Sequence, residues 1–148
     1  ASLPTTILVG FPGEHDRDFE ALLRFVEDIR FDHLGVFLYS DSGDLPAHAL
    51  SDHVPAQVAQ ERYDQLMSCQ LDISAQNYQK YIGQTLEVLV EEAIENGLFA
   101  GRALFQAPEV DGMAYIKSGP QQPIPTVGSF SRIRVSDAME YDLIGDAV

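Results

Sequence analysis

The chain has 148 residues, one cysteine and a formal net charge of −14, from 9 basic and 23 acidic side chains. Hydrophobic residues make up 45% and charged residues 22%, which is typical of a folded protein and excludes a disordered chain. The single thiol, Cys69, excludes an internal disulfide and any zinc or iron–sulfur centre built from this chain's thiolates alone. No apolar run approaches the roughly 20 residues of a membrane-spanning helix, and no basic-then-apolar leader is present, so we expect a soluble, cytoplasmic protein.

The acidic charge is spread along the chain. Residues 1–82 carry 5 basic and 13 acidic side chains, and residues 83–148 carry 4 and 10. Such a surface repels nucleic acid and attracts a basic protein, although acidic charge also serves solubility alone. Arg132 and Arg134 alternate with apolar residues and should point outward, but two cations are too few for a strong RNA site.

The first half alternates apolar runs with amphipathic segments. Thr6–Val9 ends in a Gly- and Pro-rich turn and predicts a buried strand, and Leu34–Tyr39 predicts a second one. Between them, apolar residues at three- and four-residue steps predict a helix over Asp16–Ile29, which completes a parallel βαβ unit. After a turn-rich stretch, 40–55, a long helix is predicted to about residue 81, with one apolar face: Ala59, Tyr63, Leu66, Ile73 and Tyr81.

The pattern changes near Ile82–Gly83, where we place a domain boundary. Five short strand candidates follow, separated by Gly, Pro and Asn: Thr85–Glu91, Gly101–Phe105, Met113–Ile116, Ser131–Val135 and Tyr141–Gly145. Five strands in this length favour a small closed barrel, because closure removes exposed edges. The fold class predicted is therefore α/β followed by all-β.

Two strand ends fall at the same edge of the predicted parallel sheet. Gly10–Glu14 joins the first strand to the helix, where α/β proteins bind ligands, and Tyr39–Ser40 ends the second strand. The segment lacks the spacing of a phosphate loop or a dinucleotide fingerprint. It is either a ligand contact or a tight turn that leaves Glu14 in solvent.

Other reactive side chains give weaker signals. The four histidines lack the spacing of zinc ligands, and Cys69 has no neighbouring His or Lys, which predicts a buried, inert thiol. No Gly-x-Ser-x-Gly motif is present, so no hydrolase is predicted. Carboxylates gather in the turns of the barrel, either as turn chemistry or as a surface for basic side chains: Glu109, Asp111, Glu140 and Asp142.

Several segments resemble the radical-SAM methylthiotransferase family. Thr5–Glu14 is similar to a late segment of that family's barrel, and Leu34–Ser40 is similar to its next strand. Ala107–Gly112 and Glu140–Gly145 resemble the C-terminal TRAM domain of the branch that modifies a ribosomal protein. The chain departs from the family pattern at His15, where a capping threonine is usual, and in the loop 41–45.

The resemblance implies a C-terminal piece of a longer enzyme. Residues 1–82 would form the last βαβα units of a partial radical-SAM TIM-like barrel, and residues 83–148 a five-stranded OB-like TRAM barrel. The parent would methylthiolate the β-carbon of an aspartate in a basic small-subunit ribosomal protein, with S-adenosyl-L-methionine (SAM) and two 4Fe-4S clusters. Both cluster-binding cysteine motifs are absent here, so the fragment has no catalytic residue of its own and is expected to be inactive.

The resemblance also implies residue roles. Contacts to SAM would come from one set at the sheet edge: Val9, Gly10, Phe37, Tyr39 and Ser40. Docking of the substrate protein would use one set in the barrel: Glu109, Asp111, Glu140, Tyr141 and Asp142.

Two alternatives remain open. A tRNA methylthiotransferase fragment would require a basic barrel face and retention on tRNA at physiological salt. A stand-alone acidic OB-like binding module would have no cysteine-rich coding sequence upstream. If the strands are cut from a larger barrel, we expect self-association through an unpaired edge and an apolar face near Ile7, Val9, Val36 and Leu38.

Overall fold

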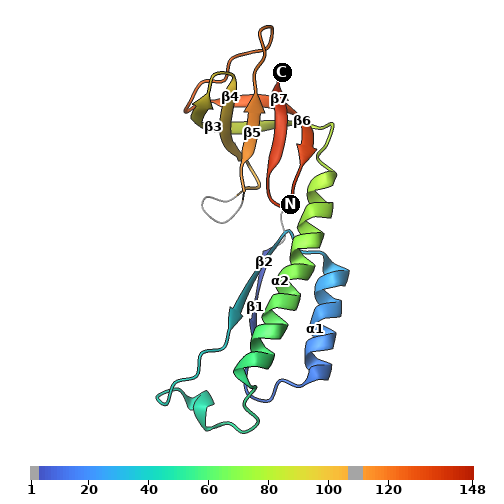
Figure 1. The fold of residues 1–148 in the computed structure, drawn as a ribbon, viewed down its shortest axis with the longest axis vertical. Coiled ribbons are helices and arrows are strands. Elements are labelled where there is room, and N and C mark those ends of the chain that lie inside the picture. Colours follow the sequence, from blue (N-terminus) through green and yellow to red (C-terminus); the bar gives the residue numbers. More distant parts are fainter. Residues whose placement is uncertain (1–3, 107–111) are drawn as a thin grey trace. The chain divides into compact units, whose positions relative to one another are not determined.

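The structure, a computed structural model, describes residues 4–106 and 112–148 (Figure 1). It divides into two compact units at Ile73/Ser74, each described separately below. The first contains β1 (Pro4–Val9), α1 (Asp16–Ile29), β2 (His33–Leu38), a 3₁₀ turn (Pro46–Ala49) and most of α2 (Ala56–Gln79). The second contains the end of α2 and strands β3 (Thr85–Glu95), β4 (Leu98–Ala103), β5 (Ala114–Lys117), β6 (Phe130–Ala138) and β7 (Leu143–Ala147). None of the helices within the described ranges is both long and apolar enough to cross a membrane.

The first unit is the predicted βαβ arrangement. β1 and β2 pair in parallel from Pro4 opposite His33 to Val9 opposite Leu38. Both helices pack on the same side of this strand pair (Figure 1). The core between sheet and helices is formed by eight buried side chains: Ile7, Val9, Phe19, Val26, Leu34, Val36, Leu66 and Ile73. The predicted α/β arrangement of the first half of the chain is confirmed.

The apolar face predicted to be open was wrong at three of its four residues. Ile7, Val9 and Val36 are buried beneath the helices. Because successive side chains of a strand alternate between its two faces, the side chains on the open face are Leu8, 49% exposed, and its partner Phe37, 61% exposed. Leu38, at the end of β2, is 40% exposed and agrees with the prediction.

The face of α2 that packs inward contains more polar groups than predicted. Ala59, Leu66 and Ile73 are buried as expected. Three polar residues, Arg62, Gln70 and Ser74, are buried as well. The Gln70 side-chain amide donates a hydrogen bond of 2.8 Å to the carbonyl of Phe31, which satisfies part of this buried polarity.

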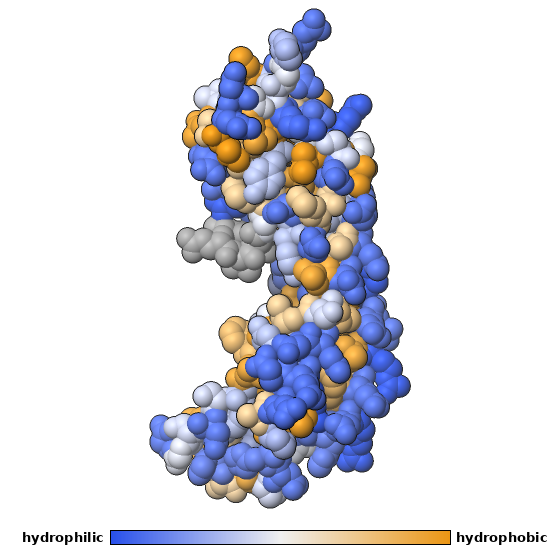
Figure 2. Space-filling model, viewed as in Figure 1, coloured by the Kyte–Doolittle hydropathy of each residue, from blue (hydrophilic) through white to orange (hydrophobic). Residues whose placement is uncertain are grey.

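The second unit is a closed five-stranded barrel with the strand order β3-β4-β5-β7-β6. β3 pairs with both β4 and β6, which closes the ring, and only β5 and β7 run parallel. Gly101 of β4 allows a close crossing, because a Cβ atom there would collide with the carbonyl oxygen of Leu89 on β3. Figure 2 shows that apolar side chains also reach the barrel surface on its β3–β4 side. The predicted closed barrel is confirmed.

Aromatic rings pack against the barrel core where α2 meets it. Tyr78, at the end of α2, is buried, and its ring centroid lies 5.9 Å from those of Tyr81 and Phe105. The rings of Tyr81 and Phe105 stack at 4.6 Å. The last turn of α2 therefore belongs structurally to the barrel unit, which begins before the first strand.

Candidate ligand and protein-docking sites

The predicted ligand edge lies where β1 and β2 end. The backbone N–H of Tyr39 donates to the carbonyl of Val9 at 2.8 Å, which holds the two strand ends together. Gly10 has a φ of +83°, and a Cβ atom there would lie 2.8 Å from the Cβ of Ala59. Only glycine combines this backbone conformation with such a close approach to α2. The Gly10 N–H faces both carboxylate oxygens of Glu14, each at 3.2 Å.

Glu14 is not solvated, contrary to one of the two interpretations above. Its carboxylate binds the guanidinium of Arg62 at 2.6 Å, and the two side chains are only 13% and 8% exposed. A second guanidinium nitrogen lies 2.8 Å from Asp16, and the guanidinium carbon lies 5.7 Å from the centroid of the Phe19 ring. Burial opposes the charge of Arg62, but its hydrogen bonds to Asp16 and Glu14 outweigh this and raise its pKa.

This ion-pair cluster was missed by sequence reasoning. It fixes the start of α1 and the Gly10–Glu14 turn on α2, because one buried cation binds both acidic partners. The helix start is supported further by Asp18, whose carboxylate accepts the backbone N–H of His15 at 2.9 Å. This contact is the half of a capping box that the third helical residue supplies, and it is present although His15 stands where a threonine is usual in the family. A hollow of about 380 Å³ lies beside Arg62, but the Arg62 guanidinium already forms ion pairs with Glu14 and Asp16, so it is poorly placed to bind an anionic ligand there.

A second polar chain follows β2. The Tyr39 hydroxyl donates to Asp41 at 3.1 Å, and the other oxygen of Asp41 lies 2.8 Å from Nδ1 of His48. The hydrogen bond from His48 lowers the pKa of Asp41. The pKa of Tyr39 is raised, mainly by partial burial and to a smaller extent by the hydrogen bond to Asp41 and the negative charge of that carboxylate. The ring of Phe11 packs edge-on against Tyr39 at 5.3 Å. These contacts hold the loop after β2 close to the strand ends.

The structure brings four of the five residues predicted to contact SAM to one edge: Val9, Gly10, Tyr39 and Ser40. The Val9 side chain is fully buried, so only its backbone is available, and the Gly10 N–H is already used by Glu14. Phe37 lies apart from them, on the open face of the sheet, where its exposed ring could cover an apolar group. Their roles toward SAM stay a prediction.

An iron–sulfur cluster does not fit the residues of this chain. Cluster ligation needs several thiolates, and Cys69 is the single cysteine. Cys69 is half-buried rather than buried as predicted, and desolvation, followed by the charges of Glu27 and Asp72, raises the pKa of its thiol. Over 4–106 and 112–148, no three His, Cys, Asp or Glu side chains are grouped to hold a metal ion.

In the barrel, the predicted docking residues separate into different roles. Asp142 accepts the backbone N–H of Met113 at 2.7 Å, so its side chain positions the start of β5. The neighbouring Tyr141 is half-buried, and its carbonyl accepts a hydrogen bond from the buried side chain of Gln106 at 3.2 Å. Glu140 is exposed and available to a partner. Glu109 and Asp111 lie outside the described residues.

Each of the four basic residues in the barrel lies beside an acidic one. Arg102 binds both carboxylate oxygens of Glu91, and the amine of Lys117 lies 3.8 Å from Asp146. The strand register places Glu87 opposite Arg132 and Asp146 opposite Arg134, and both arginines point outward as predicted. Cations with acidic neighbours are poorly suited to neutralising phosphates.

Comparison with known proteins gives a family match for the barrel and two close relatives of the whole chain. Residues 82–148, which include all five barrel strands, match the family model of the TRAM domain, and we call this barrel the TRAM barrel. The whole chain is 49% identical over 148 residues to the protein named ribosomal protein uS12 methylthiotransferase RimO from Desulfosudis oleivorans, covering 99% of this chain and 33% of that protein. It is 46% identical over 148 residues to the protein of the same name from Clostridioides difficile, covering 100% of this chain and 33% of that protein.

These similarities confirm the resemblance stated from the sequence. The chain resembles the RimO-type methylthiotransferases across both of its units, and it corresponds to their C-terminal third. It spans 33% of the length of these two relatives, so most of such a protein lies outside the chain described here.

Proposed function

We propose that this chain is the C-terminal part of an enzyme that methylthiolates a basic small-subunit ribosomal protein at the β-carbon of an aspartate. The observation that carries this proposal is the 46–49% identity to uS12 methylthiotransferases, which extends over both units rather than over the TRAM domain alone. In this proposal, the βαβ unit is the end of a partial radical-SAM barrel, and the protein acts in the cytoplasm. The cysteines for both 4Fe-4S clusters belong to the part of the enzyme outside this chain.

The βαβ unit would contribute one wall of the SAM site. When bound, SAM supplies the methyl group and the radical. The exposed ring of Phe37, on the open face of the sheet, would cover the adenine, and the backbone at Val9–Gly10 and at Tyr39–Ser40 would border it. The contact between Glu14 and the Gly10 N–H, together with Arg62, would hold this edge rigid before the ligand arrives. Without a cluster, the chain alone should be inactive.

The TRAM barrel would dock the protein substrate. Residues 83–148 carry four basic and ten acidic side chains, and each cation has an acidic neighbour. A basic protein is attracted to such a surface, and the attraction weakens as salt screens it. For the same reason tRNA, a polyanion, is a poor partner.

The test compares binding of purified ribosomal protein uS12 and of tRNA to this chain, by fluorescence anisotropy over a salt series. We expect binding of uS12 that weakens with salt, and no retention of tRNA at about 0.15 M salt, where the Debye length is about 8 Å. Reversing Glu109, Asp111 and Glu140 to Lys should weaken uS12 binding by about ten-fold, since rim charges mainly tune encounter. Reversal of Glu20, Glu27 and Glu61, three exposed residues of the other unit, is the matched control, because it changes the net charge equally. Retention of tRNA would favour a tRNA-modifying enzyme, and binding of neither would leave a stand-alone module.

A further inference from the structure

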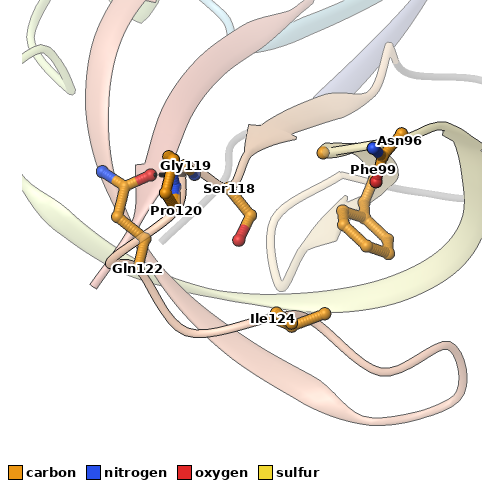
Figure 3. A pocket seen from close by; sticks show the side chains of 8 residues that line it. Asn96, Phe99, Ser118, Gly119, Pro120, Gln122 and Ile124 are labelled. Carbon is orange, nitrogen blue, oxygen red and sulfur yellow. Dashed lines mark hydrogen bonds between the residues drawn. The ribbon is translucent and has the colours of Figure 1, made fainter.

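A pocket of about 390 Å³ lies on the TRAM barrel, between the β3–β4 hairpin and the loop that follows β5 (Figure 3). Asn96 and Phe99 lie across it from the turn that contains Gly119 and Gln122, and Ile124 lies at its rim. All of these residues belong to the same compact unit. None of the residues used in the proposed function lines this pocket.

Hydrogen bonds hold both walls of the pocket in place. The Ser118 N–H donates to the carbonyl of Gly97 at 2.8 Å, which ties the loop to the hairpin. The Ser118 hydroxyl donates to the carbonyl of Pro123 at 2.7 Å, and the Gly119 N–H donates to the side-chain oxygen of Gln122 at 2.6 Å. A pocket that is preformed in this way loses little conformational freedom when a ligand enters.

The lining contains polar but uncharged groups. Within the described residues, the side-chain amide of Asn96 forms no hydrogen bond, and the Gln122 amide uses only its oxygen, so its NH₂ group is available. A primary amide offers both a donor and an acceptor, as a peptide bond does. Phe99 is half-buried and Ile124 is 80% exposed, so a partner that covers them removes apolar surface from water.

The charges around the pocket favour a cationic partner over a polyanion. Glu95 directly precedes Asn96, and Glu92 lies opposite Ala100 on the same hairpin; both are exposed, and within the described part of the chain neither forms an ion pair. The nearest cation in sequence, Lys117, already faces Asp146 at 3.8 Å. A ligand that inserts neutral groups into the pocket and carries positive charge beside it matches this arrangement.

We propose that this pocket seats an extended, uncharged segment of a basic polypeptide, whose flanking Lys or Arg side chains lie beside Glu92 and Glu95. The inference rests on the proposed docking of a protein substrate by the barrel, and it adds the place of docking. The peptide backbone would pair with the amides of Asn96 and Gln122, and an apolar side chain would cover Phe99 and Ile124. Charge attracts the partner, whereas the pocket selects the segment.

The test measures binding of purified ribosomal protein uS12, and of polylysine as a charge-only probe, to the chain and to Asn96→Ala/Ile124→Ser. We expect uS12 to bind the double variant about ten-fold more weakly, with unchanged binding of polylysine, because central contacts carry most of the affinity. Leu104→Ser is the matched control, since Leu104 is 85% exposed and lies outside the pocket. In ¹H–¹⁵N spectra of the wild-type chain, the amides of Gly97 and Gly119 should shift on addition of uS12.

Ile124→Ser alone, a change at an exposed position, keeps the test informative if the double variant misfolds. Wild-type affinity for uS12 in a folded pocket variant would overturn the pocket while leaving the proposed function intact. An equal loss of affinity for uS12 and for polylysine would show that the pocket residues act only through charge attraction, which would also overturn the pocket proposal. Absence of uS12 binding to the wild-type chain would overturn both proposals. Shifts of Gly97 and Gly119 with single-stranded RNA, but not with uS12, would assign the pocket to nucleic acid.

Discussion

The two units differ in how the edge strands of their β-sheets are paired. In the TRAM barrel, β3 pairs with β4 on one side and β6 on the other, so every strand has two neighbours. In the first unit, β1 and β2 pair only with each other within the described residues, and one face of the pair leaves Leu8 and Phe37 in solvent. A closed ring has no edge strand, whereas a two-stranded sheet is marginally stable unless another element packs against it.

The cores of the two units also differ in chemistry. The barrel core is mostly aliphatic: it includes Ile116, Ile133 and Leu143, none of them accessible to solvent, together with the buried ring of Tyr78. The first unit buries Arg62 and Gln70 alongside Leu66 on α2. The ion pairs Arg102–Glu91 and Lys117–Asp146 of the barrel are partly exposed, whereas the first unit contains a buried ion pair that joins segments 48 residues apart in sequence.

The largest effect should follow from removing that buried cation. Arg62→Met leaves the largely buried Glu14 carboxylate without its cationic partner and with only the Gly10 N–H as a donor, and we expect the free energy of unfolding of the first unit to fall by about 3–5 kcal/mol. Urea titration followed by the amide signals of α1 and β1 measures this loss. Asp16→Asn is the matched control: that side chain is 92% exposed, so its ion pair contributes less than about 1 kcal/mol. Equal losses in the two variants would show that the buried pair does not stabilise this unit.

The sequence predicted the elements well because their signals are local. The apolar steps between Asp16 and Ile29 gave the observed bounds of α1, and five apolar segments separated by turn residues gave the barrel. Which side of β1 and β2 faces the helices was not predicted correctly. Both strands are continuous apolar runs, and such runs contain no alternation that separates Ile7 from Leu8.

The site was less predictable because its contacts join distant parts of the chain. Arg62 reads in the sequence as one polar residue on a helix, and its burial depends on Glu14 and Asp16. Asp142 reads as a surface carboxylate, and its structural role depends on the backbone N–H of Met113, 29 residues earlier. Hydrophobic periodicity reports a residue's own element, but it does not report which backbone group arrives beside it.

A smaller loss of stability is expected from substitutions of Gly10 and Gly13, the two glycines with positive φ in the turn after β1. Gly10→Ala places a Cβ atom against Ala59 in a conformation with positive φ, and we expect a loss of about 2–4 kcal/mol in the unfolding free energy. Gly13→Ala shares the strain, with φ of +90°, but has open space around it, so it should lose only about 1 kcal/mol. Thermal unfolding of both variants separates the clash from the strain, and equal losses would mean that α2 moves to accommodate the methyl group.

The open sheet should make the first unit associate where the barrel does not. We predict that the apparent mass by light scattering rises with protein concentration, and that Leu8→Ser/Phe37→Ser reduces this rise. Leu104→Ser/Phe130→Ser is the control, because these barrel residues are 85% and 62% exposed but lie outside the open face of the β1–β2 sheet. A strictly monomeric wild-type chain at all concentrations, or an equal effect of the two double variants, would contradict a special role of the open sheet.

The smallest expected effect concerns the loop that follows β2, which Asp41 and His48 hold close to the strand ends. The hydrogen bond from His48 holds the pKa of Asp41 below its ordinary value, so His48→Gln should raise it in a ¹³C-detected carboxyl titration. Asp44 is the internal control, since its own low pKa depends on Ser42 and should not change. Because a lowered pKa means that the folded state prefers the carboxylate, this contact stabilises the loop above the unfolded pKa of Asp41, and its contribution is lost as the pH falls through the folded pKa. An unchanged Asp41 pKa in the variant would show that the contacts of Tyr39 with Asp41 and Phe11, and not the pair of Asp41 and His48, hold this loop close to the strand ends.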